Sequence, residues 1–250
     1  MASASSKLSS APEAALAAAR SADDLLAERA ATAVISARAL LRLGRIDESL
    51  AEFDRALARD PRALEAPTAL RDHATALRRA GRLDASLATY RKLVPLAALL
   101  PEARDAARTL LETAHVAMAL ERGRSAPELA DATNYLQGAR RLAAGSARVE
   151  VTLSLVLVLE RRGLRQEADA LLAELRGVNG WPEWSSAEYL ADRSDRLALA
   201  ALALERTDPT RAVALYGKYL ADPSVTGRWR ESASARAARL GAHSTSRGTP

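Results

Sequence analysis

The chain carries the stretch ALLRLGRIDESLAEFDRAL at residues 39–57 and, without a gap, a similar stretch ALRRAGRLDASLATYRKLV at residues 76–94. Nine of these nineteen positions are identical, and the offset between the copies is 37 residues. In each copy apolar residues recur at helical spacing on both sides of a Gly-Arg pair, which predicts a helix, a tight turn and a second helix. We expect Gly44 and Gly81 to end the first helices, because glycine readily adopts the left-handed backbone of a helix end.

Capping residues mark the expected helix boundaries. Asp47 and Asp84 follow the two Gly-Arg pairs and are expected to cap the second helices. Asp208 stands directly before Pro209, an order typical of a helix start. Ser-x-x-Glu boxes, which also predict helix starts, lie at residues 10–13, 125–128 and 185–188.

Weaker copies of the helical hairpin follow the first two. Residues 149–159 alternate between apolar and polar at first, like a strand, but the continuing apolar run and the Gly-helix pattern after it favour a helix. Helices at about 12–20 and 228–240 are expected to cap the array, and residues 1–10 and 241–250 are expected to be disordered. The approximate repeats within a helical domain at 11–240 are residues 30–61, 67–98, 109–143, 149–177 and 193–223.

The composition favours an all-helical protein. The 250 residues are 48% hydrophobic but only 4% aromatic, with 12 glycines and 10 prolines, which disfavours a β-sandwich or barrel. The absence of cysteine excludes disulfides, a thiolate nucleophile and Cys-based zinc sites. The net charge of +5 comes from 36 basic and 31 acidic residues, a mild excess that disfavours nucleic acid as a partner because such binding needs a clustered basic patch.

The hairpins resemble the tetratricopeptide repeat family, whose first helix carries small and large residues and whose second carries Ala, an aromatic and Ala. The resemblance departs from the family where Ala33 and Ser36 replace the opening Trp and Leu. The small residues of successive second helices are 36 to 46 residues apart, against 34 in the family. The matching residues are Ala37, Leu40, Gly44, Ser49, Phe53, Ala56 and Pro61 in the first copy and Ala74, Leu77, Gly81, Ser86, Tyr90 and Leu93 in the second.

This resemblance implies an all-α, right-handed α-α superhelix, a solenoid of about five helix-turn-helix hairpins with flanking capping helices. In the family the first helices line a concave groove that holds a peptide. The family's carboxylate clamp for chaperone tails, built from Lys and Asn, is not matched, so a chaperone adaptor is disfavoured. The resemblance places two sets of charged residues on the groove face of this chain. Those nearer its start are Arg38, Arg42, Arg71, Arg78 and Arg79, and those later in the chain are Glu121, Glu150, Glu160 and Glu205.

These charges leave two interpretations open. One is a groove that is basic at one end and acidic at the other, and the alternative is ordinary solvated charge on helix surfaces. Trp181 and Trp184 are a further candidate contact for a partner, or they cover the seam between adjacent hairpins. We therefore name the arginines and this Trp pair as candidate partner-binding residues.

No catalytic, metal-binding or cofactor-binding arrangement is found in the sequence. His73 and His115 each precede a Gly-Arg by eight residues, so the repeat explains them as structural or surface residues, with a shared ligand-facing position as the alternative. His243 belongs to the tail. Motifs of zinc proteases, α/β-hydrolases, phosphate loops and dinucleotide sites are missing. The expectation is a protein that is not an enzyme and needs no cofactor.

The leading functional interpretation is a non-enzymatic scaffold whose concave face binds a protein or peptide partner of acidic character. One alternative is the regulatory or substrate-recruiting part of a larger enzyme system, and a second is a binder of an anionic ligand or nucleic acid. The longest apolar stretch, residues 153–159, is far shorter than the roughly 20 residues of a membrane span, so no membrane insertion is expected. As written the chain is expected to be cytoplasmic, and extracytoplasmic if it is a truncated fragment.

Overall fold

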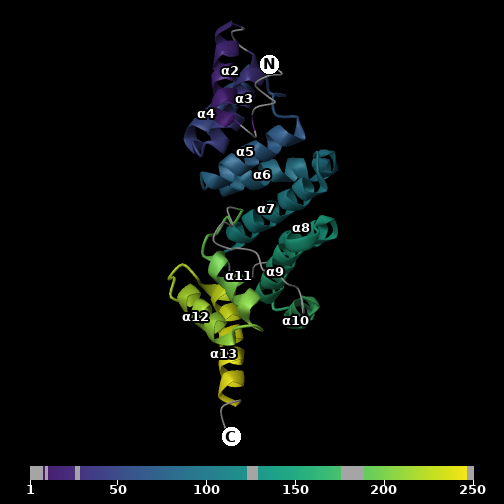
Figure 1. Cartoon of the computed structure of the whole chain (residues 1–250), viewed down its shortest axis with the longest axis vertical. Coiled ribbons are helices and arrows are strands. Elements are labelled where there is room, and N and C mark those ends of the chain that lie inside the picture. The colour runs from purple at the N-terminus through teal and green to yellow at the C-terminus, as the bar shows by residue number, and fades with distance from the viewer. Residues whose placement is uncertain (1–7, 9–10, 26–28, 123–128, 176–188, 247–250) are drawn as a thin grey trace. The chain divides into compact units, whose positions relative to one another are not determined.

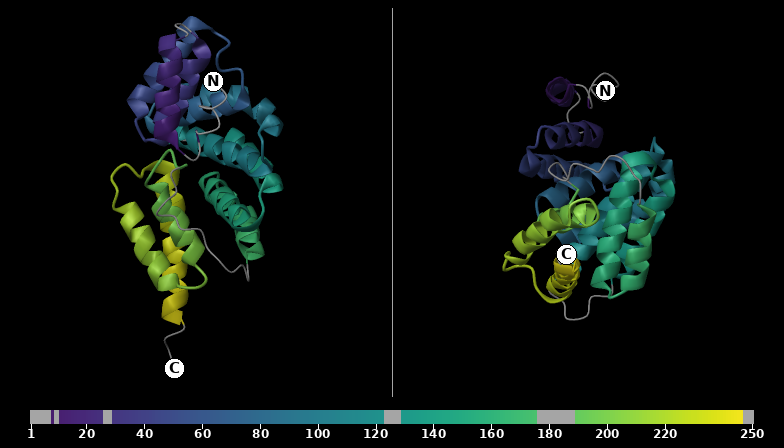
Figure 2. Two further views of the ribbon diagram at one scale, coloured as in Figure 1. Left: turned by 45° about the horizontal axis from the view of Figure 1, so that its top comes forward. Right: turned by 60° about the horizontal axis from the view of Figure 1, so that its bottom comes forward.

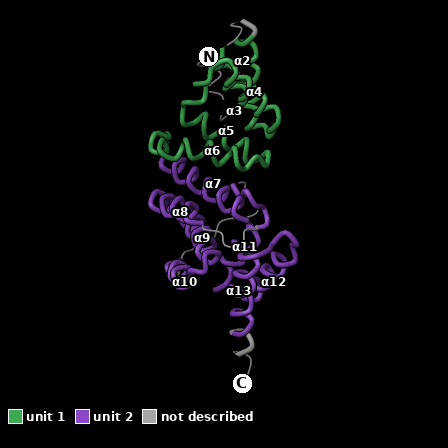
Figure 3. The backbone as a smooth tube through the Cα atoms, turned by 180° about the vertical axis from the view of Figure 1, so that it is seen from behind, with its two compact units in different colours: residues 1–101 green, residues 102–250 purple. Residues whose placement is uncertain are grey.

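The computed structural model describes residue 8 and residues 11–25, 29–122, 129–175 and 189–246. Within these ranges every regular element is a helix and no strand is present, which confirms the all-α expectation (Figure 1). The chain divides into two compact units, residues 1–101 and residues 102–250 (Figure 3).

Unit 1 is a run of helices in which each packs on the next along the chain. Helix α2 packs on α3, α3 on α4, α4 on α5 and α5 on α6. The expected early helix is therefore present and is longer than predicted. The elements of unit 1 are α2 (Pro12–Leu25), α3 (Ala30–Arg42), α4 (Ile46–Arg59), α5 (Pro67–Arg79), α6 (Leu83–Leu93) and the 3-10 helix η1 (Val94–Leu99).

The two Gly-Arg turns of unit 1 have the same geometry. Gly44 and Gly81 both have φ of 75°, in the left-handed region. At the first turn the N–H of Gly44 donates to the carbonyl of Leu41 and the N–H of Arg45 donates to that of Leu40, the bond pattern of a Schellman motif. The same pair of bonds recurs 37 residues later. The expectation that these glycines end the first helices is confirmed.

The expectation that Asp47 and Asp84 cap the second helices is wrong. Helices α4 and α6 begin at Ile46 and Leu83, so each aspartate lies inside the first turn. The Gly-Arg turn is so short that the helix resumes before the aspartate is reached, and the residue before each helix makes no side-chain cap. Each carboxylate instead lies near the positive end of the helix dipole.

A serine hydroxyl joins the two helices of each hairpin in unit 1. The Oγ atom of Ser49 donates to the carbonyl oxygen of Ala37 at 2.8 Å, and that of Ser86 donates to the carbonyl oxygen of Ala74, also at 2.8 Å. All four residues are buried. Small side chains let the helices approach until the hydroxyl reaches the backbone of its neighbour. The repeat therefore extends to an equivalent buried hydrogen bond in each copy.

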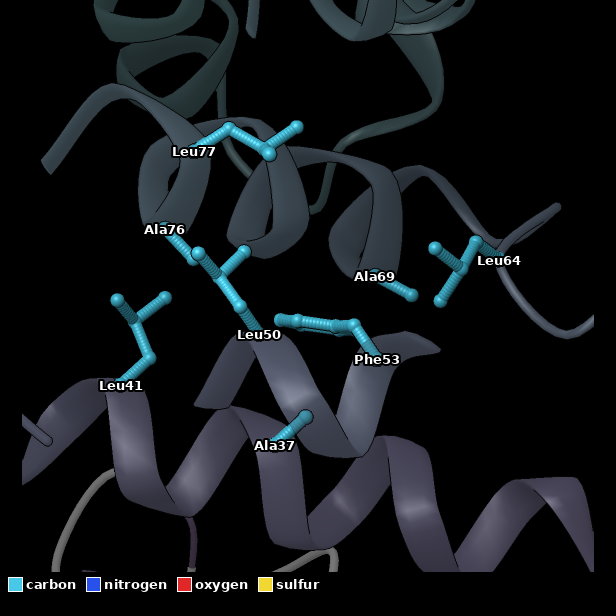
Figure 4. Packing of buried hydrophobic residues seen from close by; sticks show 8 residues of the cluster. All are labelled: Ala37, Leu41, Leu50, Phe53, Leu64, Ala69, Ala76 and Leu77. Atoms are coloured by element: carbon cyan, nitrogen blue, oxygen red, sulfur yellow. The ribbon is translucent and has the colours of Figure 1, made fainter. Parts of the chain in front are cut away.

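An aromatic ring fills the seam between the first two hairpins, as expected. Phe53 is fully buried in a cluster with Leu50, Ala69 and Ala76. Figure 4 shows Leu50 and Phe53 pointing from α4 toward α5, while Ala37 points from α3 toward α4. The small residues on α3 and α5 leave room for the ring between the helices.

Unit 2 begins with two helix pairs and ends with three helices. Helix α7 packs on α8, α8 on α9 and α9 on α10, whereas α11 and α13 each pack on both α12 and α9. Figure 2 shows α11, α12 and α13 side by side. The elements are α7 (Ala103–Glu121), α8 (Ala130–Leu142), α9 (Gly145–Arg161), α10 (Arg165–Glu174), α11 (Asp195–Leu204), α12 (Pro209–Leu220) and α13 (Gly227–Ser246).

The sequence of α9 has a physical explanation in its packing. Residues 151–161 of this helix are buried without interruption, because α8, α10, α11 and α13 all pack on it. A helix buried on all sides needs no polar face, which explains why its sequence reads partly like a strand. The prediction that residues 149–159 form a helix rather than a strand is confirmed.

Two other boundaries of unit 2 follow the sequence. Gly163 has φ of 80° and ends α9, and the Asp208 side chain caps α12 by accepting from the N–H of Arg211 at 2.9 Å. Pro209 is the first residue of that helix, as expected. The three Ser-x-x-Glu boxes lie wholly or partly outside the described residues.

Candidate functional site

Two arginines of α3 and one aspartate of α5 form an ion-pair cluster in unit 1. The Nε atom of Arg38 lies 2.6 Å from Oδ2 of Asp72, and Nη1 of Arg42 lies 3.2 Å from Oδ1 of the same residue. The side chain of Asp72 is 8% exposed and that of Arg42 is 41% exposed. Two guanidinium groups thus share one carboxylate, and Arg42 keeps part of its donor set open to solvent.

The other three arginines of the predicted groove face lie on α5. Arg79 is exposed, and its Nη1 donates to the carbonyl oxygen of Leu41 at 3.4 Å, directly beside Arg42. Arg71 is half-buried. Arg78 is buried, so its guanidinium does not belong to the exposed surface. The structure therefore brings together a smaller group than the sequence predicts, which we call the arginine face: Arg38, Arg42, Asp72 and Arg79.

Asp72 is the member of this face that sequence reasoning missed. It lies 34 residues from Arg38, and the pairing exists only because α3 and α5 pack on each other. A signal was present, since Asp72 is the only acidic residue of α5 and follows Arg71 directly. The tryptophan pair, Trp181 and Trp184, lies outside the described residues.

The two histidines of the repeat are in different settings. His73 is half-buried and its ring packs against Phe53, with ring centroids 5.0 Å apart. Burial lowers the pKa of His73 below its ordinary value. His115 is buried, and its Nε2 lies 3.1 Å from Oγ of Ser154. The half-buried ring and the buried ring do not form a shared ligand-facing position.

His115 belongs to a stack of side chains in unit 2. Its ring centroid is 5.1 Å from that of Tyr189, and the guanidinium carbon of Arg108 lies 4.3 Å from the Tyr189 centroid. Arg108 also pairs with Glu112 at 3.2 Å and with Glu150 at 3.5 Å. Burial raises the pKa of Glu150, while Arg108 opposes this effect. The charged and aromatic groups of this stack are engaged with one another, and we interpret the stack as a structural contact.

Arg236 of α13 is the centre of a second buried network, the Arg236 cluster. Its Nη1 lies 2.6 Å from Oε2 of Glu205, and its Nη2 lies 2.6 Å from Oε1 of Glu160 and 2.7 Å from Oδ1 of Asp169. The hydroxyl of Tyr216 donates to Oε1 of Glu205 at 2.7 Å. Burial raises the pKa of Glu205 although Arg236 opposes it. The cluster ties α13 to α9, to α10 and to the residue that follows α11.

Arg161 of α9 forms a third buried contact. Its Nη1 and Nη2 bind both carboxylate oxygens of Asp195, at 2.8 and 2.5 Å, and Nη2 also donates to the hydroxyl of Tyr219. The guanidinium carbon lies 4.5 Å from the ring centroid of Trp229, a cation–π geometry. The side chain of Arg161 is 0% exposed.

These networks correct the expectation for the late part of the groove face. Glu160 and Glu205 are buried and bound to Arg236, so they form neither an acidic groove nor a solvated surface. The burial of Glu160 could have been suspected from the long apolar run of α9, which ends in Glu160 and Arg161. A charged residue at the end of such a run is buried together with the helix and needs a partner of opposite charge.

The described part of the chain contains no group of three His, Asp or Glu residues that could hold a metal ion. In the same ranges no helix has the length and apolar character to cross a bilayer. Comparison with known proteins adds no relationship, since no protein-family model matches the chain and no curated protein has significant sequence similarity to it.

Proposed function

We propose that this chain is a tetratricopeptide-like repeat scaffold that is not an enzyme and that binds an acidic peptide segment of a partner protein at the arginine face. The observation that carries the proposal is the repeat in unit 1, which extends from sequence to the Schellman turns and to the buried serine hydroxyls. Repeats of helical hairpins serve mainly as binding surfaces. The right-handed superhelix of the whole array stays a prediction.

The charge of the arginine face supports an acidic partner. Arg38 and Arg42 share the one carboxylate of Asp72, so this group has one positive charge more than that acid compensates. Arg42 and the exposed Arg79 carry planar donor forks, which match carboxylates in a bidentate geometry. Asp72 also holds Arg38 in place, so part of the site is ordered before a peptide arrives.

A phage-displayed library of random dodecapeptides tests the proposal. Peptides selected on the wild-type protein are expected to be more acidic than the starting library. A selected peptide carrying a fluorophore is then titrated by anisotropy against the double variant Arg42→Glu and Arg79→Glu. We expect this variant to bind at least tenfold more weakly, because opposite charge is replaced by like charge, and we expect the affinity of the wild-type protein to fall as salt is added, because ions screen the attraction.

The matched control is the double variant Arg82→Glu and Arg165→Glu, which changes the net charge equally at the starts of α6 and α10. It should bind like the wild type. Thermal melting followed by circular dichroism checks folding, and Arg42→Gln with Arg79→Gln replaces the test variant if the glutamates unfold it. Selected peptides without acidic bias, or equal losses in test and control variants, would refute the proposal.

A further inference from the structure

A groove with a volume of about 470 Å³ opens in unit 1 between α4, α5, α6 and η1. This size is that of a pocket for a small organic molecule. Leu64 in its wall is buried, whereas Leu57, Leu70 and Leu96 are only half-buried and leave part of their apolar surface open. Among the described residues, no side chain fully covers the apolar wall of this groove.

The segment between α4 and α5 fixes one side of this groove. Helix α4 ends at Arg59, and the next residue is Asp60, whose Oδ1 accepts from the N–H of Arg62 at 2.9 Å and whose carbonyl accepts from the N–H of Ala63. These bonds turn the chain so that Leu64 points into the core cluster of unit 1. The wall is thus held by its own turn, and a ligand would not have to order it.

The polar groups of the groove leave one cation available. Glu65 is held by Arg62, whose Nε lies 2.9 Å from Oε1, and the hydroxyl of Thr89 donates to the carbonyl of Ala85 at 2.9 Å. Lys92 of α6 is exposed and, among the described residues, forms no ion pair. Its ammonium group can therefore bind an anion without breaking an existing bond.

His73 supplies a second polar group on the wall formed by α5. Burial lowers its pKa, the charge of Asp54 on α4 opposes this, and the charge of Lys92 on α6 adds to it. The lowered pKa favours the neutral imidazole, which carries one N–H donor. Glu65, the other titratable group that lines the groove, has its charge matched by Arg62.

We propose that this groove binds a small amphipathic carboxylate, with its hydrocarbon part against the leucines and its carboxylate on the ammonium group of Lys92 and the N–H of His73. The site is separate from the arginine face. None of the residues that line the groove belongs to that face, and on α5 the side chain of His73 points about 100° around the helix from that of Asp72. The inference therefore stands whether or not the arginine face binds a peptide.

Octanoate is the probe for this site, titrated into the isotope-labelled protein and followed by amide chemical shifts in NMR. We expect saturable shifts concentrated at the groove, around Leu57, Leu70 and Lys92. Lys92→Gln should weaken octanoate about tenfold, the effect of losing one charge-assisted hydrogen bond. Leu96→Trp, which places a ring in the groove, should abolish the shifts.

Two controls separate the proposed site from unspecific binding. Lys218→Gln makes the same chemical change on α12 of the other unit and should leave the affinity for octanoate unchanged. Octan-1-ol has the same hydrocarbon chain without the charge and should bind at least tenfold more weakly than octanoate. Equal binding of the alcohol, an unchanged affinity of Lys92→Gln, or shifts spread over the surface would overturn the proposal.

Discussion

Replacing Arg236 by methionine tests the buried charges of unit 2 most directly. Methionine keeps an unbranched chain in the space of the arginine stem but removes the guanidinium group. The change leaves two carboxylates, those of Glu160 and Glu205, buried with side chains 2% and 7% exposed. Asp169 loses little, because its side chain is 50% exposed and stays hydrated.

The expected loss of unfolding free energy at pH 7 is about 3–5 kcal/mol, the usual effect of removing one partner of a buried ion pair. Two buried carboxylates lose the guanidinium group, but the loss of stability should stay in this range because each carboxylate keeps another polar partner. Arg239 Nη2 lies 3.6 Å from Glu160, and Tyr216 still donates to Glu205 at 2.7 Å.

The pH dependence of this variant's stability tests whether the loss comes from ionised carboxylates in the interior. Burial already raises the pKa of Glu205, and removing Arg236 takes away the charge that opposes this rise. A carboxyl group with a higher pKa in the folded state keeps its proton there after the unfolded chain has lost it, so stability falls as the pH rises. The deficit of the variant should therefore be small near pH 4 and grow as the pH passes the ordinary glutamic acid value of about 4.3 toward 7.

Urea unfolding followed by circular dichroism at pH 4 and pH 7 measures both effects. Adding Glu160→Gln and Glu205→Gln to the Arg236→Met variant should recover more than half of the lost stability at pH 7, because the buried charges are then removed. A loss below about 1 kcal/mol at pH 7 would show that the network is not buried as described. The same loss at both pH values would refute the assignment to ionised carboxylates.

Three further predictions concern unit 1. Ala37→Leu and Ala74→Leu should each destabilise by about 1–3 kcal/mol in urea unfolding, because both positions are fully buried at helix contacts; equal melting of both variants and wild type would contradict the repeat alignment. Phe53→Ala should cost about 3–5 kcal/mol by the same assay, since the ring is 0% exposed, and a loss under 1 kcal/mol would mean that the seam is open. Lys92→Gln should raise the pKa of His73 in an NMR titration, because the lysine charge lowers it, and an unchanged or lower pKa would contradict their proximity.

The features that sequence reasoning found are those that local chemistry determines. Gly44 and Gly81 were predictable because the left-handed backbone of a helix end selects glycine, and Phe53 because the repeat places an aromatic at the seam. Asp47 was misread as a cap, since an aspartate after a turn is typical of a cap and only the length of the turn decides otherwise.

The parts that could not be predicted depend on residues far apart in the chain. The apolar run before Glu160 points to its burial, but spacing does not identify its partner Arg236, which lies 76 residues later in a helix that packs on α9. Asp72 similarly acquires its role from Arg38 on another helix. Spacing within one helix carries no information about such pairs, because their distance is set by how helices pack.

The Arg236 cluster also sets an order of events during folding. In unit 1 the bonds described above join helices that follow one another or are separated by one helix, so they can form soon after those helices are made. Glu160 on α9 must wait until synthesis has passed Arg236, and until then α9 can pack on α8, α10 and α11 but lacks α13 and the ion-pair partner of its charged end. Contacts of such long sequence separation slow folding and prolong the lifetime of sticky intermediates. We therefore expect unit 2 to be the part of the protein that folds more slowly.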